Sequence, residues 1–207
     1  MQENIAIILT IPHAKCIGNN KNHTCDASAK KLADALENKL TKITKNIHVF
    51  IGNINRSKID LNRIQSRFTP FREKVIESAK KWMNMGIKEL FVIDCHSFPV
   101  NNSGIYTFGT NEISKPQVTI LYDQSTFNID KKYADLLEKK FRDLGLKSTE
   151  LKGIHNDIID QFIQLKSKYT KIIPLLVEIR EDLNEIQINN VTIAILSWIR
   201  EISKKQD

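Results

Sequence analysis

Three ionisable side chains that follow apolar runs are the residues of this chain best suited to chemistry. His13, His96 and Glu178 each follow a run rich in Ile, Val and Leu, and the runs are Ile5–Ile11, Leu90–Ile93 and Pro174–Val177. Such continuous runs are typical of strands buried on both faces. Ligands of open α/β sheets bind outside the carboxyl ends of the strands, so we expect the three side chains to meet. Imidazoles and carboxylates at one point predict a zinc ion that activates water.

The two histidines differ in their sequence neighbours. Pro12 precedes His13 and stiffens the strand exit, which fixes where the imidazole points. Asp94 lies two residues before His96, so both side chains would face the same side of a strand. A carboxylate in that place orients a ligating imidazole and fixes its tautomer. The structural alternative is that the histidines are ordinary strand-end residues and that Asp94 binds backbone amides.

The third metal ligand is either Asp26 or His23, which form an H-x-x-D pair before a helical pattern. We favour Asp26, because a helix start supports a ligand well and a carboxylate partly offsets the charge of the metal. An aspartate at this place is also a common N-cap, which is its structural alternative. We therefore predict Zn²⁺ bound by His13, Asp26 and His96, with one position open to water.

Glu178 closes a strand of Leu and Val, where an acidic side chain is costly unless it is paired or functional. The functional hypothesis is a general base that takes a proton from the attacking water and then gives it to the leaving amine. The structural alternative is an ion pair with Arg180, two residues further on.

A polar segment, Asn55–Arg63, lies between these clusters and carries three basic side chains and two amides in nine residues. The planar fork of arginine binds carboxylates through two hydrogen bonds, so this segment could hold an acidic group of a substrate. An exposed basic turn is the alternative. The candidate substrate-binding residues are Asn62, Arg63, Arg56 and Arg180.

Composition limits the class of protein. The 207 residues suffice for a core and no linker divides them, so we expect a single domain over 1–207. No apolar stretch approaches the ~18 residues that span a bilayer, and Met1–Asn4 lacks the basic start of a signal peptide, so we expect a cytoplasmic location. The net charge is +7, but the lysines are dispersed and no nucleic-acid-binding motif accompanies them, which argues against a nucleic-acid partner.

The three cysteines are odd in number and show no C-x-x-C spacing, so we expect neither a disulfide framework nor a cysteine-only zinc site. Cys95 lies within an apolar run and is expected to be a buried thiol. Cys16 and Cys25 flank the candidate site, and ligation of the metal by one of them is a minor alternative.

Strand and helix patterns alternate along the whole chain. This alternation predicts a three-layer α/β domain with a mixed, largely parallel sheet. The expected strands are Ile5–Ile11, Ile47–Ile51, Leu90–Cys95, Gly104–Gly109, Gln117–Leu121 and Pro174–Ile179, and the expected helices are Ala27–Thr41, Thr69–Met85, Asp130–Leu144, Ile158–Lys168 and Glu185–Ile202.

Five short motifs, in order along most of the chain, resemble those of the N-formylglutamate amidohydrolase family. They are Ile11–Ala14 ("PH-small"), His23–Ala29 (an aspartate-led helix start), Ser57–Arg63 ("SR-x-x-x-DLNR"), Asp94–Ser97 ("D-x-HS") and Glu178–Leu183 ("E-x-R-x-DL"). The resemblance implies a zinc carboxypeptidase-like fold and zinc-dependent cleavage of an amide bond beside a carboxylate, in a small molecule or a peptide. It places the metal on His13, Asp26 and His96, makes Glu178 the catalytic carboxylate, and puts Asn62 and Arg63 near the substrate.

Two departures from the family pattern concern the substrate. Lys58 stands where the family has an arginine, and the glycine-rich segment before the last strand is reduced to Gly153–Asp157. Since that segment contributes to the family's substrate pocket, we expect a substrate other than N-formylglutamate. The alternative function is a non-catalytic binding protein on the same scaffold that recognises an acidic peptide or metabolite. Both histidines together with Glu178 favour catalysis, because a binding module has no need of a base beside a metal.

Overall fold

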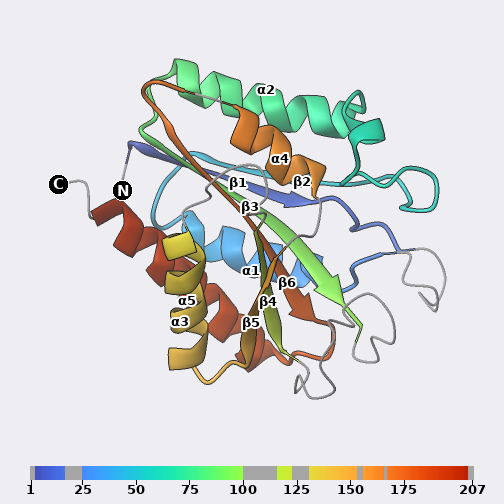
Figure 1. Ribbon diagram of the computed structural model, residues 1–207, viewed down its shortest axis with the longest axis vertical. Helices are drawn as coiled ribbons and strands as arrows, with labels where there is room; N and C mark the ends of the chain where they lie inside the picture. Colours follow the sequence, from blue (N-terminus) through green and yellow to red (C-terminus); the bar gives the residue numbers. More distant parts are fainter. Residues whose placement is uncertain are drawn as a thin grey trace.

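The structure, a computed structural model, describes residues 3–16, 25–99, 116–122, 131–152, 156–165 and 167–204. Within these residues one sheet has the strand order β2-β1-β3-β6-β4-β5 (Figure 1). The strands are β1 (Ile5–Ile11), β2 (Ile47–Ile51), β3 (Glu89–Phe98), β4 (Val118–Tyr122), β5 (Ser148–Lys152) and β6 (Lys171–Arg180). Strands β2, β1, β3 and β6 are parallel, whereas β4 runs antiparallel to β6 and parallel to β5. The predicted mixed, largely parallel sheet is confirmed.

Helices cover both faces of the sheet and complete three layers. They are α1 (Ala29–Leu40), α2 (Pro70–Asn84), α3 (Lys131–Asp143), α4 (Asp157–Gln164) and α5 (Glu185–Lys204), with a short 3-10 helix at Ile64–Ser66. Helices α1, α3 and α5 lie on one face, and α2 and α4 lie on the other (Figure 1).

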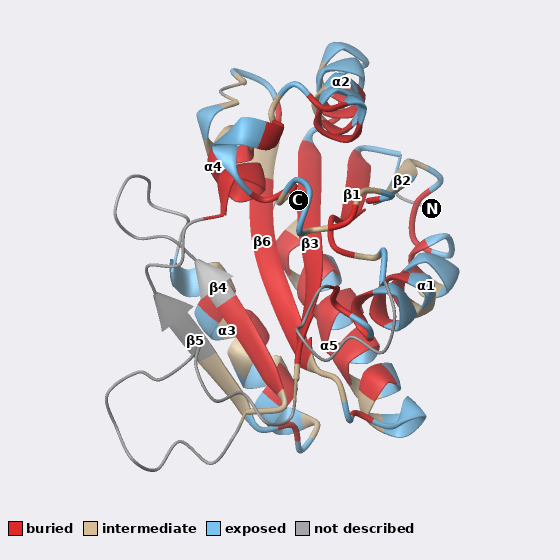
Figure 2. Ribbon diagram, turned by 90° about the vertical axis from the view of Figure 1, so that its right-hand side faces the viewer, coloured by how far each residue is buried: buried red, intermediate tan, exposed pale blue. Residues whose placement is uncertain are grey.

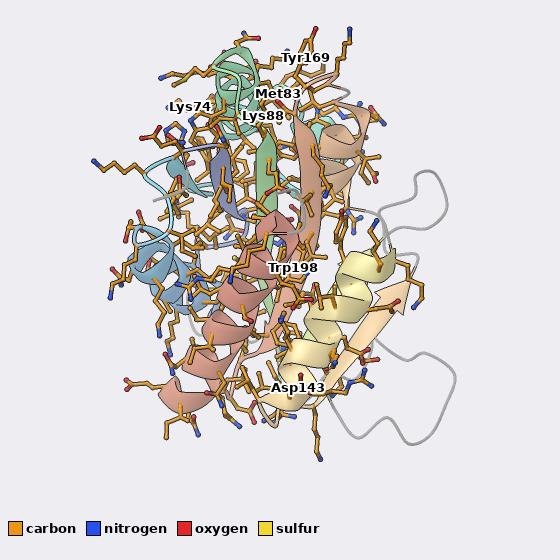
Figure 3. The ribbon with its side chains drawn as sticks, turned by 90° about the vertical axis from the view of Figure 1, so that its left-hand side faces the viewer. Lys74, Met83, Lys88, Asp143, Tyr169 and Trp198 are labelled. Atoms are coloured by element: carbon orange, nitrogen blue, oxygen red, sulfur yellow. A yellow bond between two sulfur atoms is a disulfide. The ribbon has the colours of Figure 1, made fainter. Side chains whose placement is uncertain are left out.

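The alternation of side chains along β1 shows why the central strands read as unbroken apolar runs. Ile7 and Leu9 pack into the core beneath α1 and α5, whereas Ala6 and Ile8 pack into the core beneath α2 and α4. Both faces of the strand are therefore buried, as Figure 2 shows for β1, β3 and β6. On the α5 side, Trp198 is fully buried and its Nε1 donates to the carbonyl oxygen of Tyr133 at 2.8 Å, which joins α5 to α3 (Figure 3).

The predicted ends of α2 are confirmed and have a local cause. The Thr69 side chain accepts a hydrogen bond from the backbone N–H of Arg72, and Pro70 occupies the first turn, where a missing N–H costs nothing. Gly86 follows the helix with φ of +83°, a left-handed conformation that glycine adopts without steric cost.

The structure also differs from the predicted elements. Strand β3 continues to Phe98, because it stays paired with β6 up to Arg180, so His96 lies within the strand. Strand β5 was not predicted, since its sequence STELK is polar; it forms at the sheet edge by pairing with β4. Helix α4 ends at Gln164, four residues before the predicted end. The predicted strand Gly104–Gly109 and the predicted cap Asp130 lie outside the described residues.

The expectation of no disulfide is wrong. Cys16 and Cys25 are bonded, with Cα atoms 4.9 Å apart. The segments that carry them lie together, since the Asp26 N–H donates to the carbonyl oxygen of His13 at 3.0 Å. A count of cysteines cannot show this proximity. Cys95 is a buried thiol, as predicted, and burial raises its pKa.

Among the described residues we find no helix that is both long and apolar enough to cross a membrane.

Candidate metal centre

The structure brings His13, Asp26 and His96 to one point at the carboxyl ends of the central strands. His13 follows β1, His96 lies near the end of β3, and Asp26 stands just before α1. All three are buried, and each offers one ligand atom within 4.8 Å of the others. The centroids of the two imidazole rings are 5.2 Å apart. The three residues that the sequence nominated as metal ligands thus form a cluster, and their ligation of zinc stays a prediction.

Both imidazoles turn the same nitrogen toward Asp26. The Nδ1 atom of His96 lies 2.6 Å from Oδ2 of Asp26, and the Nδ1 atom of His13 lies 3.4 Å from the same oxygen. The carboxylate therefore stands between the two rings. Two imidazole nitrogens and one carboxylate oxygen are a donor set that catalytic zinc sites use.

The opposite nitrogen of each ring faces another carboxylate. The Nε2 atom of His13 is 2.8 Å from Oδ1 of Asp60, and the Nε2 atom of His96 is 3.0 Å from Oδ2 of Asp94. A carboxylate at Nε2 holds the proton there and leaves the Nδ1 lone pair for a metal. Both rings are thus oriented for ligation through Nδ1.

The charges of the cluster fit a bound cation. Burial opposes the protonation of His96, but the carboxylates of Asp94 and Asp26 outweigh it and raise the pKa of the imidazole well above 6.5. Burial likewise opposes the ionisation of Asp26, but the two imidazoles beside it, one of them the hydrogen-bonded ring of His96, prevail and lower its pKa. The Nδ1 atom of His13 is buried and makes no hydrogen bond to the described residues. The carboxylates therefore favour positive charge at this point, and Nδ1 of His13 faces it.

Asp26 does not cap the helix that follows it. Helix α1 begins at Ala29, the N-cap position is Ser28, and the Asp26 side chain bonds His96 instead. Other contacts hold the helix start: the Ser28 N–H donates to Oγ of Ser97 at 3.1 Å, and the Ser28 hydroxyl donates to the carbonyl oxygen of Glu181 at 3.2 Å. His23, the other candidate third ligand, lies outside the described residues.

Glu178 lies beside His96 in the sheet. The two residues are paired in the register of β3 and β6, and Thr119 of β4 is paired with Glu178 on its other side. Directly paired residues of neighbouring strands project to the same face. Glu178 is buried, and it lies within β6 rather than beyond its end, because the strand continues to Arg180. Arg180 donates from Nε to Oδ1 of Asp182 at 2.5 Å.

The predicted substrate-binding residues of the Asn55–Arg63 segment lie against the cluster or against Asp60 beside it. Arg56 places Nη1 3.7 Å from Oδ1 of Asp26, and Arg63 places Nε 3.5 Å from Oδ2 of Asp60. Asn62 is buried with its side-chain amide 2.9 Å from Nε2 of His96. Asn62 and Arg56 therefore each contact a metal-ligand candidate, whereas Arg63 contacts Asp60.

Asp60 is the residue of this centre that sequence reasoning passed over. Burial opposes its ionisation, but the hydrogen bond to His13 and the charges of His13 and Arg56 lower its pKa. The sequence could have indicated Asp60, because it is the only carboxylate of the Asn55–Arg63 segment. Nothing local, however, places it against His13, which is 47 positions away.

Replacing Asp60 with Asn should weaken zinc binding. The amide keeps the size and the acceptor for the Asn62 N–H but removes the charge that favours Nε2 protonation of His13. Loss of such a partner typically costs 10–100-fold in metal affinity, and we expect a dissociation constant about 10-fold higher. Titration of Zn²⁺ against a chromophoric chelator measures it. Asp34→Asn is the control, because the Asp34 side chain is exposed on α1. Equal zinc affinities in the two variants would contradict the role of Asp60.

Comparison with known proteins gives a likeness in structure alone. No protein-family model matches the chain, and no curated protein matches it by sequence. N-formylglutamate amidohydrolase from Ralstonia eutropha JMP134 superposes with a TM-score of 0.72 at 13% identity, over 99% of this chain and 96% of that one. The chain has the fold of an N-formylglutamate amidohydrolase. The resemblance read from the five motifs is thereby confirmed at the level of the fold.

Other solved structures share this amidohydrolase fold. The gene product Atu2144 from Agrobacterium tumefaciens has a TM-score of 0.69 at 15% identity, over 100% of this chain and 91% of that one. N-acetylmuramoyl-L-alanine amidase from Clostridium difficile 630 has a TM-score of 0.56 at 13% identity, over 99% of this chain and 100% of that one. A metallo-carboxypeptidase from Burkholderia cenocepacia has a TM-score of 0.51 at 14% identity, over 98% of this chain and 58% of that one, in line with the expected zinc carboxypeptidase-like fold.

Proposed function

We propose that this protein is a zinc-dependent hydrolase that cleaves an amide bond next to a carboxylate, in an N-acyl amino acid or at a peptide C-terminus. The observation that carries the proposal is the convergence of His13, Asp26 and His96 at one point, with Glu178 on the adjacent strand beside His96. The names of the solved structures with this fold, an amidohydrolase, an amidase and a metallo-carboxypeptidase, support the reaction class.

Each residue of the cluster has a role in this proposal. His13, Asp26 and His96 would hold the ion through Nδ1, a carboxylate oxygen and Nδ1. Bound zinc supplies a Lewis acid that polarises the carbonyl and lowers the pKa of water. Glu178 takes the proton of the attacking water and delivers it to the departing amine, the task of a general acid–base group. Asp60 and Asp94 keep the two imidazoles oriented throughout.

The arginines at the edge of the cluster suit a substrate with a free carboxylate. Arg56 is partly exposed and Arg63 is exposed, and both contact Asp60. A guanidinium has five N–H donors, so an arginine that binds Asp60 through Nε can also bind a substrate carboxylate with its terminal nitrogens. Arg180 at the end of β6 is the third arginine that could bind the substrate carboxylate. Asn62 would bind the substrate beside His96.

Replacing Arg63 with Ala should raise KM for a substrate with a free carboxylate more than it lowers the melting temperature. Loss of one partner of a charge pair in a binding site costs about 2–5 kcal/mol, and the exposure of Arg63 places the effect near the lower value. The fall in kcat/KM should therefore be about 30-fold. Arg142→Ala, an exposed arginine on α3 paired with Glu138, is the control. Equal kinetics in both variants would show that Arg63 is an ordinary surface residue.

The whole proposal is tested by metal analysis together with hydrolysis. We expect about one equivalent of zinc in the purified protein, consistent with a single catalytic site. N-formyl and N-acetyl amino acids and short peptides should then be hydrolysed, and the same compounds with an amidated C-terminus should be poor substrates. Zinc binding and substrate binding without turnover would instead support the non-catalytic binding protein. A protein that binds no zinc would contradict both the metal site and the proposed reaction.

A further inference from the structure

We propose that Asn156 is a positioning residue of the metal centre, which fixes Asp94 and through it the imidazole of His96. The inference rests on the proposed zinc site. It adds to that site a residue that neither binds the metal nor touches the substrate in the proposal above. Asn156 is the buried N-cap residue of α4, on the α2 and α4 side of the sheet. Its Nδ2 donates to Oδ2 of Asp94 at 2.8 Å.

The orientation of the Asn156 amide is fixed by the helix that it caps. Its Oδ1 accepts hydrogen bonds from the backbone N–H of Ile158 at 2.9 Å and of Ile159 at 3.1 Å. Because an oxygen must face these two donors, the NH₂ group has to face the other way, toward Asp94. The cap of α4 therefore sets a donor at a defined place next to the metal centre.

Asp94 is held on both of its oxygens. Oδ1 accepts from the Thr10 hydroxyl at 2.5 Å, and Oδ2 lies 2.8 Å from Nδ2 of Asn156 and 3.0 Å from Nε2 of His96. Two neutral donors on opposite oxygens fix the plane of this fully buried carboxylate. Without Asn156, Oδ2 of Asp94 would lose one of its two contacts and keep only the one with His96. The carboxylate could then turn about its bond to Cβ. The direction of the imidazole would then be less well defined.

The neighbouring residue holds the second partner of His96. The Asp157 N–H donates to the carbonyl oxygen of Asn62 at 3.0 Å, and the side-chain amide of Asn62 meets Nε2 of His96. The Asp157 carboxylate is itself bound by Nη2 of Arg67 at 2.6 Å and by Nη2 of Arg72 at 2.8 Å. The start of α4 is thus anchored, and it holds both groups that face Nε2 of His96. Displacement of a ligand's partner typically costs 10–100-fold in metal affinity.

The decisive variant is Asn156→Ser. Serine caps a helix about as well as asparagine, but its side chain is too short to reach Asp94. We expect the dissociation constant for Zn²⁺ to rise about 10-fold, and the absorption spectrum of the Co²⁺-substituted protein to shift. The melting temperature of protein treated with a chelator should stay close to the wild-type value. Should this variant fail to fold, Asn156→Asp is the second test, because it keeps the size and the cap and replaces the donor with a carboxylate oxygen that repels Asp94, so zinc affinity should again fall.

The matched control is Asn184→Ala. Asn184 caps α5 by accepting from the N–H of Gln187 at 2.9 Å. This control should lower the melting temperature and leave the Zn²⁺ dissociation constant unchanged. Equal zinc affinity in wild type and Asn156→Ser, or an equal loss in Asn156→Ser and Asn184→Ala, would overturn the inference and leave the proposed function in place. A wild-type protein that binds no zinc would overturn both.

Discussion

Replacing Glu178 with Gln is expected to lower kcat by about 100-fold or more, with zinc content and melting temperature near their wild-type values. Gln has the same shape and can still meet the neighbours of Glu178, but it cannot accept the proton of the attacking water. Glu178 is suited to this part because it is buried on β6 in register with His96 of β3. Steady-state kinetics, metal analysis and thermal unfolding of the same preparations measure the three quantities.

A structural role for Glu178 predicts the opposite pattern. If its main function is to pair with Arg180, the Gln variant leaves a guanidinium without its partner, and breaking a buried pair costs about 3–5 kcal/mol of stability. Glu89→Gln is the matched control, since Glu89 is a buried glutamate at the first residue of β3, at the other end of the strand from His96. An unstable Glu178→Gln protein with activity in proportion to its folded fraction would reject the general base.

Replacing Asp157 with Asn is expected to lower the free energy of unfolding by about 3–5 kcal/mol. Asp157 and Arg72 have side chains that are each 1% exposed, so the variant leaves the Arg72 guanidinium buried without its carboxylate. Arg67 loses the same partner, which it binds through both Nε and Nη2. Denaturant unfolding measures the loss. Asp34→Asn, which breaks an exposed pair with Lys30, should cost about 0–1 kcal/mol and serves as control.

The same ion pair makes stability depend on pH. Burial opposes the ionisation of Asp157, but the hydrogen bonds from Arg67 and Arg72 outweigh it, so the pKa of the folded state lies below 3.8. The contribution is therefore present above pH 3.8 and disappears as the pH falls through the folded-state pKa. We expect wild-type stability to fall more steeply in this acidic range than that of Asp157→Asn. Parallel curves for the two proteins would show that the pair does not govern this part of the profile.

The sequence by itself determined most of the elements and nominated the centre. A continuous apolar run predicted β1 with its observed ends, because a strand buried on both faces is apolar almost throughout. The edge strand β2 also has its predicted ends, although it contains His48 and is only partly buried. Thr69 with Pro70, and Gly86, gave the ends of α2, because capping and positive φ depend on the residue itself. His13 and His96 could be named because they stand at strand ends that must share one edge of a parallel sheet, and Asp26 because it precedes a helix.

Tertiary structure alone decided which side chains serve that centre. Asp60 meets His13 across 47 positions, and Asp157 meets Arg72 across 85, and no periodicity in the sequence records such pairings. The polar strand β5 exists because β4 offers an edge with unpaired backbone groups, not because of its own residues. The bond between Cys16 and Cys25 depends on the backbone contact between His13 and Asp26, which brings the two segments together. Local patterns specify elements through the conformational preferences of single residues, whereas these contacts depend on where the packed layers place the ends of those elements.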